Sequence, residues 1–171
     1  MSLAEIKSDP VVKRALALKE SADAAINLER IVTEADMLHS ERASRKLYKI
    51  SLEPTKLANA SLQDMSNRAR LSELKARVYV QRTAVQHAFE HCSAHISTQH
   101  RDTMKEYASN AGDRKMFLNR VLNKLVESIS NMDSTLELLE IYIKDIDQSA
   151  WAIRNATDML KLLMDNRGKA V

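Results

Sequence analysis

The fold is decided by residues 118–164, which read LNRVLNKLVESISNMDSTLELLEIYIKDIDQSAWAIRNATDMLKLLM. Alternating steps of four and three residues meet thirteen apolar side chains in fourteen positions. That spacing places one apolar seam along a helix, as in coiled coils and helical bundles. The seam comprises Leu118, Leu122, Leu125, Ile129, Met132, Leu136, Leu139, Ile143, Ile146, Ala150, Ile153, Thr157, Leu160 and Met164. No catalytic or ligand motif of comparable strength occurs in the chain.

The composition indicates long helices with few turns. Only two Gly and two Pro occur in 171 residues, and aromatic residues make up 4% against 29% charged residues. Compact folds with strands need many turns, and turns favour Gly and Pro. The length suits one domain. We therefore expect a single helical-bundle domain over residues 1–171, with 1–8 as a flexible segment and 167–171 as a C-terminal tail.

The expected fold is all-α, an elongated antiparallel three-helix bundle. Its helices are predicted over about residues 10–52, 55–108 and 113–166. The connections between them are short, and short connections make successive helices antiparallel neighbours.

Residue types at the predicted ends support these boundaries. Asp9 and Pro10 suit the cap and the first position of a helix. Pro54 disfavours helical backbone at the residue before it and permits a new helix after it. In the loop at 109–113, Gly112 can end one helix and Asp113 can cap the next.

The first two predicted helices also carry apolar seams. The seam of the first helix changes phase near Leu28. The second helix is predicted to face inward with Leu71, Leu74, Val78, Gln81, Val85, Ala88, Cys92, His95 and Gln99, whereas Leu57, Leu62 and Met65 follow a different phase.

Charge supports the antiparallel arrangement. Residues 42–82 contain ten Lys or Arg and three Asp or Glu, a net charge of +7, and residues 127–165 contain three and eight, a net charge of −5. These segments lie side by side if the third helix returns along the second. Because a surface ion pair contributes only about 0 to 1 kcal/mol, the pattern selects orientation and register more than it stabilises the fold.

The third helix has a second set of apolar residues outside its seam. A helix that is apolar on two sides is central in a larger core or is covered by a partner. We interpret this set as a partner interface with Trp151 as its anchor; the alternative is that the first helix covers it within one chain. The set is Leu138, Ile141, Trp151, Met159 and Leu162.

Histidines on the second helix raise the question of a metal site. His87, His91 and His95 are spaced by four residues, and Cys92 lies beside them. Imidazoles one helical turn apart can share a metal ion, but further ligands must come from another helix. His91, Cys92 and His95 are thus weak candidates. We favour the interpretation that these histidines are solvated, and we expect neither a metal nor a cofactor.

A basic cluster flanks the predicted first reversal. It comprises Arg42, Arg45, Lys46, Lys49, Lys56, Arg68 and Arg70. Such a cluster can contact anionic lipid, nucleic acid or an acidic protein. Nucleic acid is disfavoured because aromatic residues for base stacking are scarce. A solvated or internally paired charged face is the simpler interpretation.

Enzyme signatures are absent from the sequence. It contains no Gly-rich phosphate loop, no GxSxG and no paired Cys motif. A single cysteine, Cys92, excludes an internal disulfide framework and fits a reducing compartment. No apolar N-terminal segment occurs, so we expect a soluble, cytoplasmic protein that is not an enzyme.

In general outline the expected bundle resembles spectrin-like repeats and membrane-bending BAR dimers, without a matching motif. The leading hypothesis is a coiled-coil interaction or scaffold protein, in a tethering, trafficking or cytoskeletal complex, that self-associates or joins another coiled-coil protein through its third helix. The alternative, which the BAR resemblance implies, is a homodimer that binds an anionic membrane through the basic cluster. A third hypothesis is a metal-binding helical bundle.

Overall fold

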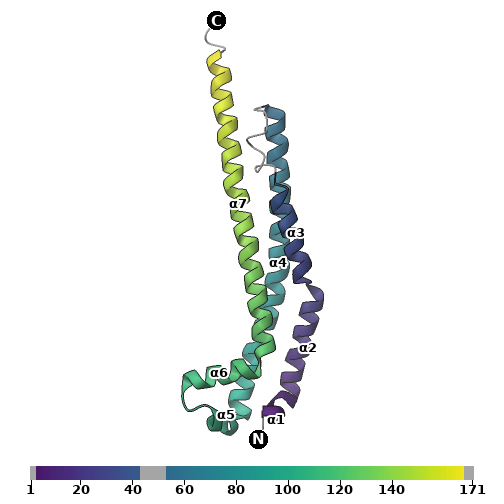
Figure 1. Cartoon of the computed structure of the whole chain (residues 1–171), viewed down its shortest axis with the longest axis vertical. Helices are drawn as coiled ribbons and strands as arrows, with labels where there is room; N and C mark the ends of the chain where they lie inside the picture. Colours follow the sequence, from purple (N-terminus) through teal and green to yellow (C-terminus); the bar gives the residue numbers. More distant parts are fainter. Residues whose placement is uncertain (1–2, 43–52, 168–171) are drawn as a thin grey trace. The chain divides into compact units, whose positions relative to one another are not determined.

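The computed structural model describes residues 3–42 and 53–167, and the predicted all-α class is confirmed because no strand occurs among them. The helix count differs from the prediction of three. The described residues form α1 (Leu3–Ser8), α2 (Pro10–Ala25), α3 (Leu28–Ser40), α4 (Pro54–Gln99), α5 (Arg101–Tyr107), α6 (Ala111–Val121) and α7 (Asn123–Arg167) (Figure 1). Residues 3–8, expected to be a flexible segment, form α1.

Each predicted long helix is interrupted at a residue that is neither Gly nor Pro. Ile26 has extended backbone, with φ −125° and ψ 113°, and separates α2 from α3. His100 separates α4 from α5, and Leu122 separates α6 from α7. All three side chains are buried. Each helix therefore ends at a buried residue, where tertiary packing overrides local helix propensity.

Two predicted helix starts are confirmed. Asp9 caps α2, since its Oδ1 accepts a hydrogen bond from the Val11 amide at 2.7 Å, and Pro10 occupies the first position. Helix α4 begins at Pro54. The preceding part of the reversal, residues 43–52, lies outside the described residues.

The predicted roles of Gly112 and Asp113 are wrong. Asn110 caps α6, because its Oδ1 accepts a hydrogen bond from the Asp113 amide at 2.9 Å. Gly112 lies inside α6, and the Asp113 carboxylate accepts a hydrogen bond from the Ser109 hydroxyl at 2.9 Å. An Asn side chain is as good a cap as an Asp one, so the helix starts earlier than we predicted.

The chain divides into two compact units. The first combines residues 1–28 and 77–136, and the second combines residues 29–76 and 137–171. Helices α4 and α7 each contribute one part to each unit.

In the first unit, α2 packs beside the C-terminal part of α4. The Cys92 thiol donates a hydrogen bond to the Val11 carbonyl at 3.6 Å, and His95, further along α4, meets Asp9. The numbering runs in opposite directions, so these helices are antiparallel. Helix α6 contacts α1 and α5 and runs at a steep angle to the start of α7 (Figure 1). The core contains Ile6, Val12, Ala15, Ala22, Val78, Val85, Cys92, Ile96, Phe117, Leu125 and Met132.

In the second unit, α3 and the N-terminal part of α4 are antiparallel. Arg70 donates a hydrogen bond to Glu34 at 2.6 Å, and the Asn67 amide donates to the Leu38 carbonyl at 3.0 Å. The core contains Ile31, Ala35, Leu57, Ala60, Leu71, Leu74, Leu139, Ile146 and Ile153.

Helices α3 and α7 are parallel in the second unit. The Tyr142 hydroxyl donates to Asp36 at 2.6 Å, and His39 hydrogen bonds to Asp145 at 2.6 Å. The contact residues advance in the same direction along both helices, which shows that the helices are parallel. The His39 and Tyr142 rings stack with their centroids 4.0 Å apart.

The seam predicted for α7 consists of two rows of residues, each with a spacing of seven. One of these rows is confirmed. Every seventh residue from Leu125 to Ile153 is buried. In the other row Leu136 is half-buried, whereas its neighbour Thr135 is buried, as is Ser128. The inward stripe is therefore displaced by one residue toward small polar side chains, which permit close helix approach.

In α4, one row of buried positions repeats every seven residues from Leu57. This row comprises Leu57, Asp64, Leu71, Val78, Val85 and Cys92, and Ala60, Leu74 and Ile96 are buried beside it. Leu57 thus belongs to the main phase, contrary to our prediction, and Leu62 and Met65 are exposed.

The predicted pairing of basic and acidic segments is confirmed at three ion pairs between α4 and α7. Lys75 lies 3.3 Å from Glu140 in the second unit, which also holds the pair of Arg68 and Asp147. In the first unit the Arg82 Nε lies 2.9 Å from Asp133. Successive pairs are seven residues apart on both helices, as antiparallel heptads require.

Candidate functional site

An exposed apolar stripe follows α7 in the second unit. Four residues of the predicted interface are largely exposed: Ile141 by 60%, Trp151 by 67%, Met159 by 66% and Leu162 by 63%. Leu138, the fifth, is half-buried. Leu163 is exposed by 59% and extends the surface. We call Ile141, Trp151, Met159, Leu162 and Leu163 the α7 stripe.

Helix geometry explains why the stripe is exposed. Ile153 points into the core, where it packs with Leu57, Ala60 and Leu160. Trp151 precedes it by two residues, which turns its side chain roughly 200° around the helix. The hydrogen bonds between α3 and α7 are made at Tyr142 and Asp145 of α7. Within the described part of the chain, the first predicted helix therefore does not bury these residues, contrary to the alternative interpretation.

Charged residues of alternating sign border the stripe. Arg154, Asp158, Lys161 and Asp165 follow one another at intervals of four, three and four residues, which places them on one side of the helix. All four are exposed. Lys161 lies 3.8 Å from Asp158.

The basic cluster falls partly outside the described residues, which exclude Arg45, Lys46 and Lys49. Its other members have acidic neighbours. Arg42 pairs with Asp145, Lys56 with Glu53, Arg68 with Asp147, and Arg70 with Glu34 and Glu73.

The ion pairs of Arg68 and Arg70 stabilise the charged form of each guanidinium group. Hydrogen bonds to Glu34 and then to Glu73 raise the pKa of Arg70, and the hydrogen bond to Asp147 raises that of Arg68. Their positive charge is therefore largely offset by carboxylates of the same unit, which weakens its attraction for an outside anion.

The predicted metal candidates are not brought together. His91 is exposed, whereas Cys92 is buried with its thiol directed at a backbone carbonyl. Burial, and secondarily the charge of Asp9, raise the pKa of this thiol. The third candidate, His95, instead joins two residues that the spacing did not select, Asp9 and His100.

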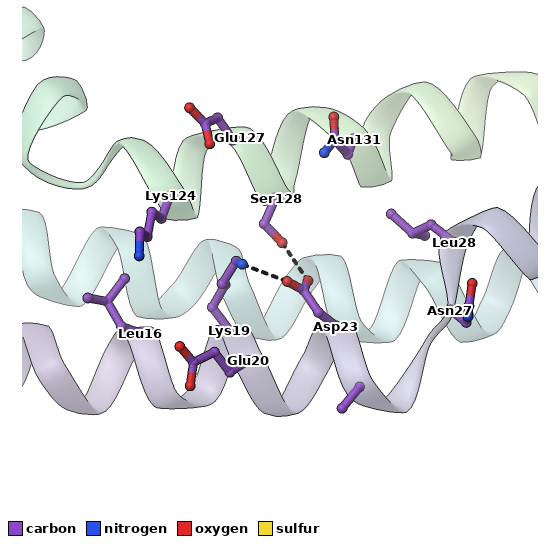
Figure 2. A pocket seen from close by; sticks show the side chains of 11 residues that line it. Leu16, Lys19, Glu20, Asp23, Asn27, Leu28, Lys124, Glu127, Ser128 and Asn131 are labelled. Atoms are coloured by element: carbon purple, nitrogen blue, oxygen red, sulfur yellow. Dashed lines mark hydrogen bonds and ion pairs between the residues drawn. The ribbon is translucent and has the colours of Figure 1, made fainter.

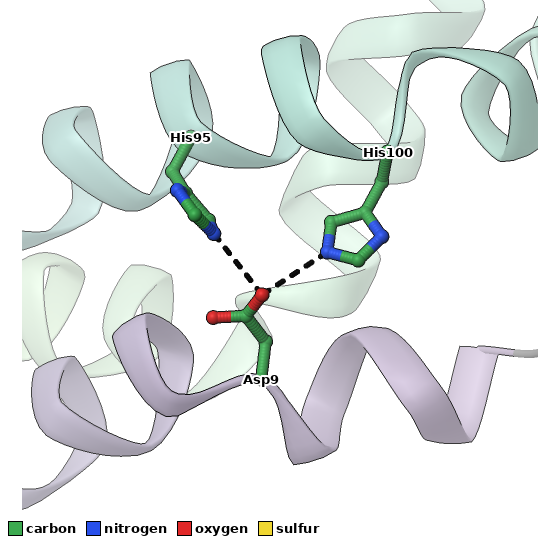
Figure 3. Close-up of side chains that lie close together, drawn as sticks. All are labelled: Asp9, His95 and His100. Atoms are coloured by element: carbon green, nitrogen blue, oxygen red, sulfur yellow. Dashed lines mark hydrogen bonds and ion pairs between the residues drawn. The ribbon is translucent and has the colours of Figure 1, made fainter.

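The Asp9 carboxylate lies between two imidazoles (Figure 3). Its Oδ2 is 3.0 Å from the Nε2 of His95 and 3.1 Å from the Nε2 of His100. The hydrogen bond from His95 is the main cause that lowers the pKa of Asp9, and those from His100 and the Val11 amide add to it against the effect of burial.

Sequence reasoning identified Asp9 only as a cap. His95 and His100 are five residues apart, a spacing that separates two side chains on a continuous helix. The interruption at His100 changes that relation. An Asp-Pro helix start and two histidines near a helix end were the available signals, but neither shows that the segments meet.

A groove also lies between α2 and the start of α7, with a volume of about 580 Å³ (Figure 2). The Asp23 carboxylate accepts a hydrogen bond from Ser128 at 2.9 Å and pairs with Lys19 at 2.7 Å. Charges of both signs line the groove, including Glu20, Lys124 and Glu127. No convergent set of donors or acceptors among these residues selects a ligand.

Comparison with known protein families, with curated proteins and with solved structures finds no match to this chain. None of the helices in the described ranges combines the length and apolarity of a membrane span.

Proposed function

We propose that this protein is a non-enzymatic interaction module that self-associates through the α7 stripe. The observation that carries the proposal is the exposure of Trp151, Met159 and Leu162 along one helix. Single apolar side chains are normal on a protein surface, but several along one side of a helix, including a Trp, are typical of an interaction site.

The occupant that we propose is a second copy of the chain, bound antiparallel. If the pairing is centred between residues 159 and 160, Arg154 faces Asp165 of the second copy, and Asp158 faces Lys161. Each cation then meets an anion beside the apolar stripe, as in coiled coils with complementary flanking charges. Parallel pairing in register instead opposes like charges, which disfavours it.

The apolar residues of the α7 stripe and the charged residues beside it have different roles in the association. In this register Met159, Leu162 and Leu163 lie near the centre of the pairing, and Trp151 lies toward one end of it, beside the end of α7 of the second copy. A Trp that is buried in an interface commonly contributes about 2 kcal/mol or more, which is roughly a thirtyfold change in affinity. The exposed charges contribute less and select orientation and partner. The module is thus held by apolar contact and aligned by charge.

A charge-exchange experiment tests the pairing. In one variant Arg154→Glu and Lys161→Glu make all four flanking positions acidic, and in another Asp158→Lys and Asp165→Lys make them basic. Both variants alone should be monomeric in sedimentation at low salt, and an equimolar mixture should form heterodimers. Circular dichroism confirms that each remains helical.

Variants that self-associate as strongly as the wild type would contradict charge-aligned pairing of copies. A monomeric wild type would equally overturn the proposal and would direct the search to a different protein partner. The membrane alternative remains a prediction, and the carboxylate partners of Arg42, Lys56, Arg68 and Arg70 give it less support.

A further inference from the structure

We propose that Asp9, His95 and His100 form a binding site for a divalent transition-metal ion of the zinc class. The three residues come from different places in the first unit: Asp9 precedes α2, His95 lies near the end of α4, and His100 follows that end. Each offers one ligand atom, and the three atoms all lie within 4.8 Å of one another.

The distances suit a shared ion. Zinc binds imidazole nitrogen and carboxylate oxygen at about 2.0 to 2.2 Å in a tetrahedral arrangement, so neighbouring ligand atoms are roughly 3.3 to 3.5 Å apart. The Oδ2 of Asp9 lies 3.0 Å and 3.1 Å from the two Nε2 atoms. These two separations are within a few tenths of an ångström of that spacing, and the two Nε2 atoms lie within 4.8 Å of each other.

The carboxylate is oriented before any ion binds. Its Oδ1 accepts a hydrogen bond from the Val11 amide at the start of α2. This hydrogen bond orients the carboxylate so that Oδ2 faces the two histidines. His100 is buried with only 9% of its surface exposed, and His95 is half-buried. Ligands that are already held in place lose little conformational freedom on binding.

The ligand set selects the class of metal. Two imidazoles and one carboxylate suit zinc, cobalt or nickel, whereas calcium and magnesium prefer oxygen ligands alone. Three protein ligands leave a fourth position for water or for an anion.

One feature of the site limits its affinity. Binding through Nε2 requires each neutral ring to carry its proton on Nδ1. The Nδ1 of His100 is buried and has no hydrogen-bond partner in the described structure. Metal-bound histidines normally donate that proton to an acceptor, and loss of such a contact weakens affinity about 10- to 100-fold. We therefore expect weaker binding than at a site whose two histidines both donate that proton to an acceptor.

A competition titration tests the site. The full-length chain, without an affinity tag and stripped of metal, is titrated with Zn²⁺ against a chromophoric chelator. The expected result is one saturable site per chain. Asp9→Asn, His95→Gln and His100→Gln should each weaken binding by about tenfold or more, whereas His91→Gln, an exposed histidine of the same helix, should leave it unchanged.

The design separates metal binding from folding. Asn at position 9 keeps an acceptor for the α2 cap, so Asp9→Asn should retain the helical circular dichroism of the wild type. Co²⁺ provides a second readout, because a tetrahedral Co²⁺ site absorbs visible light and the three ligand variants should lose that absorption.

Two results would overturn the proposal. One is the absence of saturable Zn²⁺ binding by the wild type. The other is an equal loss in His91→Gln and in the ligand variants, which would assign binding to scattered surface histidines. Trp151→Asp should bind Zn²⁺ like the wild type, so failure of the metal site is distinguishable from failure of self-association.

Discussion

At the scale of residues, Cys92 shows how burial controls reactivity. Its side chain is buried in the first unit, and its pKa is raised. A raised pKa means that less reactive thiolate is present at any given pH below it. Burial also excludes a reagent until the helices separate.

We predict that native Cys92 reacts with iodoacetamide at pH 8 at least about a hundredfold more slowly than in the denatured chain, because reaction requires local opening. The rate should rise with pH as the thiolate fraction grows. Mass spectrometry of timed samples measures it, with denatured protein as the control. Equal native and denatured rates would show that this part of α4 is not packed.

The two sites illustrate which residues a sequence can assign. Trp151, Met159 and Leu162 were predictable as an outward surface because one helical period relates them to the seam. Asp9 and His100 were not predictable as neighbours, since their contact depends on where α2 lies against α4 and on the interruption at His100. Periodicity reports the face of a single helix and does not report which segments meet.

At the scale of elements, the helical content and one row of each main heptad were predictable, whereas the interruptions were not. Ile26, His100 and Leu122 have no helix-breaking chemistry, and they are buried where one helix ends and the next begins. Only the change of phase in the apolar seam near Leu28 indicated one of these interruptions, the one at Ile26. Packing decides such positions, and a single sequence does not display packing.

The ion pair between Arg82 and Asp133 provides a test of helix register. A double-mutant cycle with Arg82→Ala and Asp133→Ala should give a coupling free energy of about 0.2 to 1 kcal/mol, because both side chains are partly exposed. Urea denaturation at low salt measures it, and added salt should reduce it. Zero coupling at low salt would contradict the register described for this unit.

Two leucines of α7 make a matched pair for its two faces. Leu139 is fully buried, so Leu139→Ala should lower the free energy of unfolding by about 2 to 5 kcal/mol through lost contacts and a cavity. Leu162→Ala should change it by less than about 0.5 kcal/mol when the protein is dilute enough to be monomeric. Equal losses in urea denaturation would show that both faces are buried in one chain.

At the scale of the whole molecule, the two sides of α7 differ in burial. Its inner side completes the helix packing of each unit, and its outer side, in the second unit, remains available to another chain. Trp151 and Leu162 contribute nothing comparable to the fold of the single chain, because each is more than half exposed. The central claim is that a second copy covers them.

Light scattering coupled to size-exclusion chromatography, over a dilution series at low and moderate salt, tests this claim most directly. We predict a wild-type mass about twice 19.4 kDa, which falls toward that value on dilution, and a monomeric Trp151→Asp variant with unchanged helical content. A wild type that stays at 19.4 kDa at every concentration, or a Trp151→Asp variant that keeps the doubled mass, would contradict it.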